Sequence, residues 1–172
     1  NWTTPPEPGE GIRTDGGVLV LTAAYTDTGA SSALPLRGEF SIVLHSRKKK
    51  AALYDESNGM QYVDQVEGEK GIIGHFEDGD FIIWRELNLN GIESIRVRAG
   101  SLSDQPGRIE LRKGSSHGVL LASIHVSPTG ENEFIEIPAK LKGTNGLVDI
   151  CVVGRFENPN GQVLGLNWIE FQ

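Results

Sequence analysis

The stretch Gly107-Arg108-Ile109-Glu110-Leu111-Arg112 alternates apolar and polar residues, and Leu166-Asn167-Trp168-Ile169-Glu170-Phe171 follows a similar spacing at the C-terminus. Between them, Val126-Ser127-Pro128-Thr129-Gly130 reads as a strand end followed by a turn. Apolar residues at every second position, broken by Gly, Pro, Ser and Asn, indicate short strands of a half-buried antiparallel sheet.

The same pattern extends over most of the chain, and no segment longer than a turn or two keeps a helical apolar period. The predicted strands cover residues 18–25, 40–45, 81–84, 94–99, 108–112, 119–126, 134–138, 147–153 and 166–171. Nine or ten strands without helices predict an all-β fold, an antiparallel β-sandwich of the jelly-roll type with an N-terminal extended segment.

The length of 172 residues suits one domain with a short extension. Residues 1–17 are rich in Pro, Gly, Thr and Glu and read as a linker or disordered lead-in. We assign residues 18–46 to an N-terminal strand extension and residues 47–172 to the sandwich. The chain begins at Asn1 without a visible signal peptide, so we expect it to be a piece of a longer polypeptide.

The formal net charge is −7, with 16 Lys and Arg against 23 Asp and Glu. A nucleic-acid partner would need a basic face that displaces counterions, so we predict none. No stretch is long and apolar enough to span a bilayer, and we predict no membrane partner. The basic run Arg47-Lys48-Lys49-Lys50 reads as a solvated guard of a strand edge.

Candidate catalytic groups are few. Cys151 lies in an apolar run and has no neighbouring base, so it reads as a small buried hydrophobe. Pairs of carboxylates could hydrolyse a glycosidic bond only across a cleft of defined width. Glu77 with Asp80, and Glu131 with Glu133, have suitable spacing. With 23 acidic residues such pairs also arise by chance, and we predict no enzyme.

Two of the predicted strands carry charged residues opposite their apolar positions. If both strands lay in one sheet, Arg96, Arg98, Arg108, Glu110 and Arg112 would line its outer surface. That surface would be either a solvated ladder of opposite charges or a polar platform that hydrogen-bonds sugar hydroxyls.

Four short motifs together resemble the family 6 carbohydrate-binding modules, which have a galactose-binding-like jelly roll. Gly74 to Phe81 is similar to that family's Gly-Tyr-Ile-x-x-Gly-Asp-Trp signature, and Arg98 to Ser101 to its Arg-Val-Ala-Ser strand end. Pro128 to Gly130 is similar to its Pro-x-Thr-Gly-Gly-Trp turn, and Leu166 to Phe171 to its closing Leu-Asp-Trp-Ile-Glu-Phe. The resemblance covers residues 51–171.

The resemblance implies a sugar-binding loop cleft with two aromatic faces and one Asn. The expected first aromatic falls on Gly71, the second on Glu131 or Asn132, and the expected Asn on Gly165. The usual cleft is therefore degenerate in this chain. The resemblance also implies a structural calcium ion, yet its ligand positions hold Lys50, Ala52 and Asn167. Since calcium prefers several oxygen ligands with charge among them, we expect no calcium there and no cofactor.

Some members of that family bind sugar on a concave sheet face instead. The resemblance assigns Gln61, Phe81 and Arg98 to that face, with Arg112 beside them. A ring can stack on a sugar, and amide and guanidinium groups can hydrogen-bond its hydroxyls. His75, which precedes an acidic turn, and Asn132 complete the predicted set. For each residue ordinary core packing or surface polarity is the alternative.

The expected function is that of a non-catalytic carbohydrate-binding module of a secreted, periplasmic or cell-surface bacterial protein. Residues 21–29, followed by Pro35-Leu36, resemble segments that precede such modules in large secreted bacterial proteins. The expected partners are therefore a polysaccharide or oligosaccharide and a neighbouring domain of a larger protein. The alternatives are a degenerate module with a structural or protein-interaction role beside a sugar-active enzyme domain, and a small hydrolase.

Overall fold

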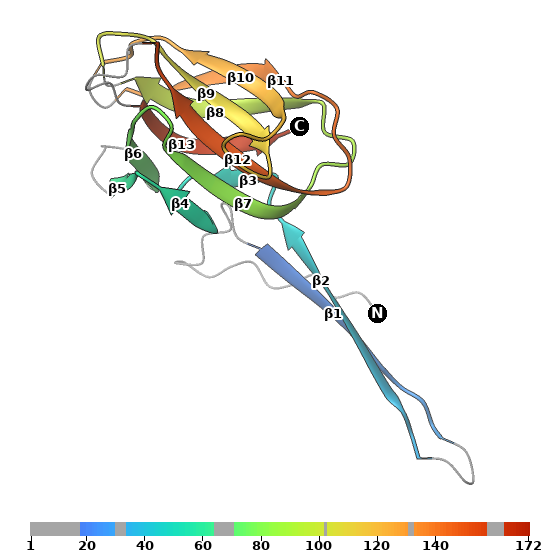
Figure 1. The fold of residues 1–172 in the computed structure, drawn as a ribbon. Coiled ribbons are helices and arrows are strands. Elements are labelled where there is room, and N and C mark those ends of the chain that lie inside the picture. The colour runs from blue at the N-terminus through green and yellow to red at the C-terminus, as the bar shows by residue number, and fades with distance from the viewer. Residues whose placement is uncertain (1–17, 30–33, 64–70, 102, 131–132, 158–163) are drawn as a thin grey trace. The chain divides into compact units, whose positions relative to one another are not determined.

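The computed structural model describes residues 18–29, 34–63, 71–101, 103–130, 133–157 and 164–172. The chain forms two compact units, residues 1–46 and residues 47–172. The described part of the first unit is a hairpin, and the second unit is a sandwich of two antiparallel sheets (Figure 1). Among the described residues no helix is long and apolar enough to cross a membrane.

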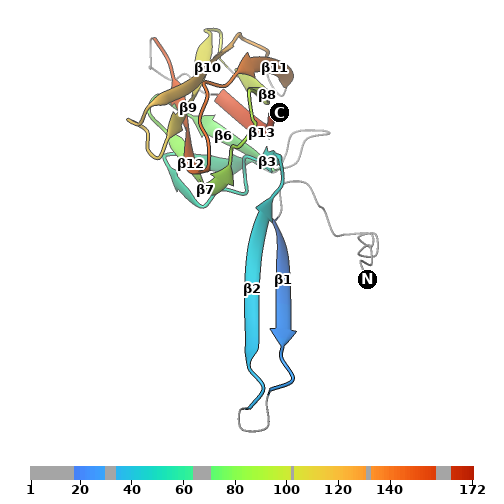
Figure 2. The ribbon, with the colours of Figure 1, turned by 90° about the vertical axis from the view of Figure 1, so that its right-hand side faces the viewer.

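The hairpin of the first unit consists of β1 (Val18–Thr26) and β2 (Arg37–His45), which lie side by side along their whole length (Figure 2). Nine residue pairs hold the antiparallel register, from Val18 opposite His45 to Thr26 opposite Arg37. Beyond Thr26, a carboxylate oxygen of Asp27 accepts hydrogen bonds from the backbone N–H groups of Gly29 and Leu36, both at 2.9 Å. A short polar side chain thus satisfies backbone donors where the ladder ends.

One sheet of the second unit has five strands in the order β10-β9-β12-β7-β4. These are β4 (Glu56–Asn58), β7 (Phe81–Asn88), β9 (Gly107–Lys113), β10 (Leu120–Val126) and β12 (Leu147–Arg155). A bulge interrupts β7 where it pairs with β12, and Glu86 there has a positive φ of 54°. Its backbone N–H is satisfied by a carboxylate oxygen of Asp149 at 2.9 Å.

The other sheet has six strands, five of them in the order β11-β8-β13-β6-β5, while β3 also pairs with β13. These are β3 (Lys48–Lys50), β5 (Gln61–Val63), β6 (Ile72–Phe76), β8 (Ser94–Ser101), β11 (Ile135–Lys140) and β13 (Leu164–Phe171). The short β4 and β5 follow one another in the chain but belong to different sheets.

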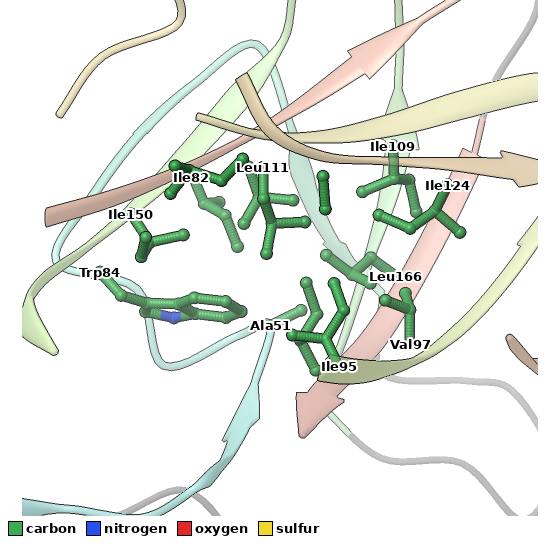
Figure 3. Packing of buried hydrophobic residues seen from close by; sticks show 14 of the residues in the cluster. Ala51, Ile82, Trp84, Ile95, Val97, Ile109, Leu111, Ile124, Ile150 and Leu166 are labelled. Carbon is green, nitrogen blue, oxygen red and sulfur yellow. The ribbon is translucent and has the colours of Figure 1, made fainter. Parts of the chain in front are cut away.

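The core lies between the two sheets. Figure 3 shows side chains such as Ile82, Leu111 and Ile150 of the five-stranded sheet, with Val97 and Leu166 of the six-stranded sheet. Trp84 is fully buried, and its ring meets that of Phe171 edge to face at a centroid distance of 6.5 Å. The predicted all-β sandwich is confirmed, because alternating apolar residues of both layers fill one common interior.

The predicted joint platform of charges does not form, because its two strands belong to different sheets. Arg96 and Arg98 lie on β8 of the six-stranded sheet, whereas Arg108, Glu110 and Arg112 lie on β9 of the five-stranded sheet. The chain crosses from one sheet to the other between Ser101 and Gly107. Alternation along a strand shows which residues share a face, but not the sheet to which the strand belongs. The sequence alone therefore does not decide whether these two strands share a sheet.

Candidate functional site

A small apolar cluster lies on the outer face of the five-stranded sheet, opposite the core. It consists of Ile83, Cys151 and Val153, with Phe81 packed against them and partly exposed. Burial raises the pKa of the Cys151 thiol to about 11, and the nearby Glu56 carboxylate adds to that rise. The thiol is therefore neutral and acts as apolar surface beneath the partly exposed ring.

The strand register brings charged residues onto the same face as this cluster. Phe81 lies opposite Val153, which lies opposite Glu110 of β9. In the neighbouring row, Cys151 lies opposite Arg112. Because directly paired residues of an antiparallel sheet point to the same side, Phe81 and Arg112 share one surface, two strands apart.

The charged groups on this surface form a connected network. Oε2 of Glu110 accepts a hydrogen bond from Nε of Arg112 at 2.8 Å and a longer one from Nε of Arg155 at 3.5 Å. The two guanidinium groups also donate to carbonyls of the β9–β10 connection, Arg112 to Gly118 at 2.9 Å and Arg155 to Ser116 at 3.5 Å. Each guanidinium group is bonded both to Glu110 and to a backbone carbonyl, so its N–H groups point in fixed directions beside the apolar cluster.

The remaining predicted residues lie elsewhere. Gln61 on β5, His75 on β6 and Arg98 on β8 all belong to the six-stranded sheet, and Asn132 lies outside the described residues. Gln61 and His75 are exposed near the edge formed by β5 and β6, and Gln61 pairs with Gly74. The structure thus brings Phe81 and Arg112 together on one sheet and places Gln61 and Arg98 on the other.

The outer face of the six-stranded sheet carries Trp168 under a layer of cations. Trp168 is only 5% exposed, with Nζ of Lys48 4.2 Å from its ring centroid and the guanidinium of Arg96 at 5.8 Å. Arg96 also donates to Glu170, which lowers the pKa of that carboxyl and raises the pKa of Arg96. Trp168 is thus buried on the outer face of the sheet and not in the core, and charged side chains cover it.

The positions that the resemblance assigns to the loop cleft are filled differently. Gly165 is buried, and a side chain there would meet Cζ of Phe134 at 2.8 Å from its Cβ. The backbone of Gly71 has a φ of 74°, which favours glycine, and a Cβ there would stand 3.5 Å from Cδ of Lys50. The ring of Phe134 takes the space in which a cleft side chain from position 165 would stand.

Two of the three side chains at the positions implied for a calcium ion carry no oxygen ligand. They are Lys50, which ends in an ammonium group, and Ala52, which has only a methyl group. The aliphatic part of Lys50 and the methyl group of Ala52 both lie next to Gly71. The adjacent Lys49 is 4% exposed, and desolvation lowers its pKa while Asp55 opposes that shift. Calcium needs several oxygen ligands with negative charge. Within the described part of the chain, no group of three His, Cys, Asp or Glu residues could hold a metal.

The acidic turn after β6 uses two of its carboxylates to hold the backbone. Oδ1 of Asp78 accepts from the N–H of Phe156 at 2.8 Å, and Oδ2 of Asp80 accepts from the N–H of Glu77 at 3.0 Å. Carboxylates bound in this way satisfy backbone donors where the strands end. Glu131, of the second candidate pair, lies outside the described residues.

Sequence reasoning missed the parts of this surface that depend on register. The roles of Glu110 and Arg155 beside Arg112 follow from strands that lie about 40 residues apart in the chain. It also missed two exposed tyrosines of the second unit, Tyr54 at 39% and Tyr62 at 57% exposure. The signal for Tyr62 was its place next to Gln61 in a short polar stretch. Arg155 gave no signal, because its pairing with Glu110 is set by the order of the strands in the sheet.

Solved structures share this architecture. A β-1,3-glucan-binding family 6 module from Bacillus halodurans is 28% identical, with a TM-score of 0.67, over 74% of this chain and 96% of that chain. A family 6 module from Clostridium stercorarium in complex with cellobiose is 26% identical, with a TM-score of 0.62, over 73% and 92%. One from Clostridium cellulolyticum in complex with xylose is 26% identical, with a TM-score of 0.66, over 73% and 95%.

Curated relatives are larger proteins. An endo-1,4-β-xylanase A of Thermoclostridium stercorarium is 27% identical over 157 residues, which are 89% of this chain and 22% of the xylanase. This chain therefore spans about a quarter of the length of the curated relatives it matches. The 89% of this chain that is aligned with the xylanase is longer than the segment 50–172, so the alignment includes part of residues 1–49. The family model for carbohydrate binding module family 6 matches residues 50–172, and the chain belongs to that family.

Proposed function

We propose that this chain is a non-catalytic module that binds a polysaccharide through the outer face of its five-stranded sheet. The observation that carries the proposal is the shared surface of Phe81 and Arg112, with an apolar cluster on one side and the Glu110 network on the other. Membership of a family of carbohydrate-binding modules supports the same conclusion.

The chemistry of this surface suits a sugar ring. The C–H groups on one face of a pyranose can stack on the partly exposed ring of Phe81. Hydroxyl groups can receive hydrogen bonds from Arg112 and Arg155 and donate to Glu110. Only one face of the sugar is contacted on such an open surface, so binding is weak per site. Its effect is to raise the local concentration of substrate for a tethered partner.

The proposal extends to the setting of the module. Polysaccharides too large to cross a membrane are met outside the cytoplasm, so we expect the module to act at the cell surface, in the periplasm or in the medium. The xylanase relatives, of which this chain matches about a quarter, support a place in a larger bacterial protein beside a sugar-active enzyme domain.

Affinity electrophoresis and calorimetry with a β-1,3-glucan, a xylan and cellobiose test the site. We expect Phe81→Ala and Arg112→Ala to weaken binding to the retained glycan at least tenfold. The matched controls are Tyr62→Ala and Arg98→Ala, which change the same kinds of side chain on the six-stranded sheet. Unchanged affinity in both Phe81 and Arg112 variants would remove this face. Loss in Arg98→Ala and Gln61→Ala would instead assign the site to the other sheet, where Gln61, Arg98 and His75 remain predictions.

A second candidate is a structural or protein-interaction module that no longer binds sugar. The observation in its favour is the ring of Phe134 over Gly165, together with the stem of Lys50 beside Gly71, where the resemblance expects cleft residues. This candidate predicts no retention on any glycan of a broad array, and wild-type behaviour of Phe81→Ala in every binding assay.

A further inference from the structure

The hairpin of the first unit has one face made only of apolar side chains and small residues. Directly paired residues share a face, so Leu19 with Leu44, Leu21 with Ile42, and Ala23 with Phe40 all point to one side. Tyr25 continues this row opposite Gly38. Four of the larger side chains are strongly exposed: Leu19 at 52%, Tyr25 at 72%, Phe40 at 70% and Ile42 at 46%. We call this surface the apolar face.

The opposite face of the hairpin is mixed: it carries the charges and hydroxyl groups of the hairpin, and also the exposed apolar pair Val20 and Val43. Thr22 and Ser41 share a hydrogen bond of 2.8 Å, and Arg37 pairs with Glu39 at 3.0 Å. The contrast between the two faces is the pattern of a sheet that meets water on one side and other protein on the other. A two-stranded hairpin alone is marginally stable in water. Among the described strands, β1 and β2 pair with each other in a sheet of two strands.

We infer that the apolar face docks on a β-sheet of a neighbouring domain in the same polypeptide and completes the sandwich of that domain. The face bears no charge, so it suits neither an anionic nor a highly hydrated partner. Nine residues per strand suit another sheet, whose own apolar face can cover this one.

Size separates this occupant from a second copy of the chain. Nine residues at about 3.4 Å each make a face about 30 Å long, and two strands make it about 10 Å wide. Two such faces together would bury about 600 Å², which is about half of what a stable separate interface needs. A tethered domain needs far less contact, because the tether supplies an effective concentration in the millimolar range.

The relatives provide an independent argument for a tethered partner. Their alignment with this chain reaches into residues 1–49, beyond the module itself, and most of each relative lies outside the aligned part. In this chain only Ser46 and Arg47 separate the end of β2 from the start of β3. A domain that covers the hairpin is therefore tethered to the module through a very short stretch of chain. This inference does not depend on where the module binds its glycan.

Hydrogen exchange tests the inference on the 172-residue chain and on the natural polypeptide that contains it. Amides of residues 18–45 should exchange on the order of 100-fold more slowly in the natural polypeptide, because docking suppresses local opening. Equal exchange in both would overturn the inference. Slow exchange already in the 172-residue chain would also overturn the inference. If that protection depends on protein concentration, a second copy of the chain covers the face. If it does not, the chain's own module covers the face.

A matched pair of variants tests the face itself. Ile42→Thr places a hydroxyl on the apolar face, whereas Val43→Thr places one at the next position on the opposite face, and the two residues are 46% and 50% exposed. Threonine keeps the β-branched shape that suits a strand, so hairpin propensity changes little. In the natural polypeptide we expect Ile42→Thr to lose at least tenfold in protection and Val43→Thr to keep it. Equal effects, or the reverse order, would overturn the inference.

Discussion

Arg112 and Glu110 lie two residues apart on β9 and point to the same side of the five-stranded sheet, with Nε of Arg112 2.8 Å from Oε2 of Glu110. The Glu110 side chain is 12% exposed, so water competes little for its oxygens. Since Nε of Arg155 approaches the same oxygen at 3.5 Å, one carboxylate holds two guanidinium groups together. The proposed glycan surface therefore depends on Glu110 even if no sugar touches it.

The first prediction concerns this carboxylate. Glu110→Gln removes the negative charge between two cations, so we expect the free energy of unfolding to fall by about 1–3 kcal/mol. Glycan affinity should fall as well, because both guanidinium groups lose their fixed direction. Urea unfolding and calorimetry measure the two effects. Glu136→Gln is the control, since Glu136 is 43% exposed on the other sheet and pairs with Arg96 at 3.3 Å. Equal stability of both variants would contradict the prediction.

The second prediction concerns the lone thiol. Burial raises the pKa of Cys151 to about 11, and the residue is 0% exposed. At pH 8 the folded protein should therefore react with iodoacetamide only through unfolding, and the rate should rise with urea in step with the unfolded fraction. Rapid labelling of the native protein at pH 8 would show that the outer face opens locally.

The fold could be predicted because alternation and turn residues are local features. The strand ends shifted by only a few residues, as in β9, predicted over 108–112 and found over Gly107–Lys113. The site could be predicted only in part. Phe81 and Arg112 share a face through two steps of register that the sequence does not contain, and Gln61 and Arg98 lie on the other sheet for the same reason.

Burial of polar and aromatic groups was the hardest feature to predict. Trp168 is large and lies in an apolar run, which is typical of a core residue, yet it lies on the outer face with Lys48 and Arg96 over its ring. Long cationic side chains can cover an aromatic ring while their charged ends reach water. Such cover depends on which strands stand beside β13, a fact of topology and not of local pattern.

The third prediction concerns pH. Arg96 donates to Glu170 and lowers the pKa of that carboxyl below its ordinary value of 4.5. The folded state therefore gains stability from this group above pH 4.5, and loses it as the pH falls through the lowered pKa. Wild type should melt at a higher temperature than Glu170→Gln at pH 7, and the difference should shrink below pH 4.5. A difference that stays constant from pH 7 to pH 3 would contradict this account.

The fourth prediction concerns the acidic turn. Asp78→Asn keeps an acceptor oxygen for the N–H of Phe156, while Asp78→Ala removes it. We expect Asp78→Ala to lower the free energy of unfolding by about 1–2 kcal/mol and Asp78→Asn by less. Thermal melts measure the difference. We expect the wild type to show no turnover of aryl glycosides. Turnover by the wild type that Glu77→Gln abolishes would show instead that the turn serves hydrolysis.

The fifth prediction concerns calcium. Lys50 and Ala52 stand where the resemblance expects carboxylate or amide ligands, and the Lys50 stem packs beside Gly71. The Lys50 ammonium group repels a divalent cation, so we expect that neither EDTA nor millimolar calcium changes the melting temperature. The combined variant Lys50→Glu, Ala52→Glu and Asn167→Asp supplies three carboxylates at these positions. We expect calcium to raise its melting temperature, because binding to the folded state alone stabilises that state. The control without negative charge is the combined variant Lys50→Gln, Ala52→Gln and Asn167→Ser. A calcium-dependent melt of the wild type would mean that other oxygen ligands have replaced the lost ones.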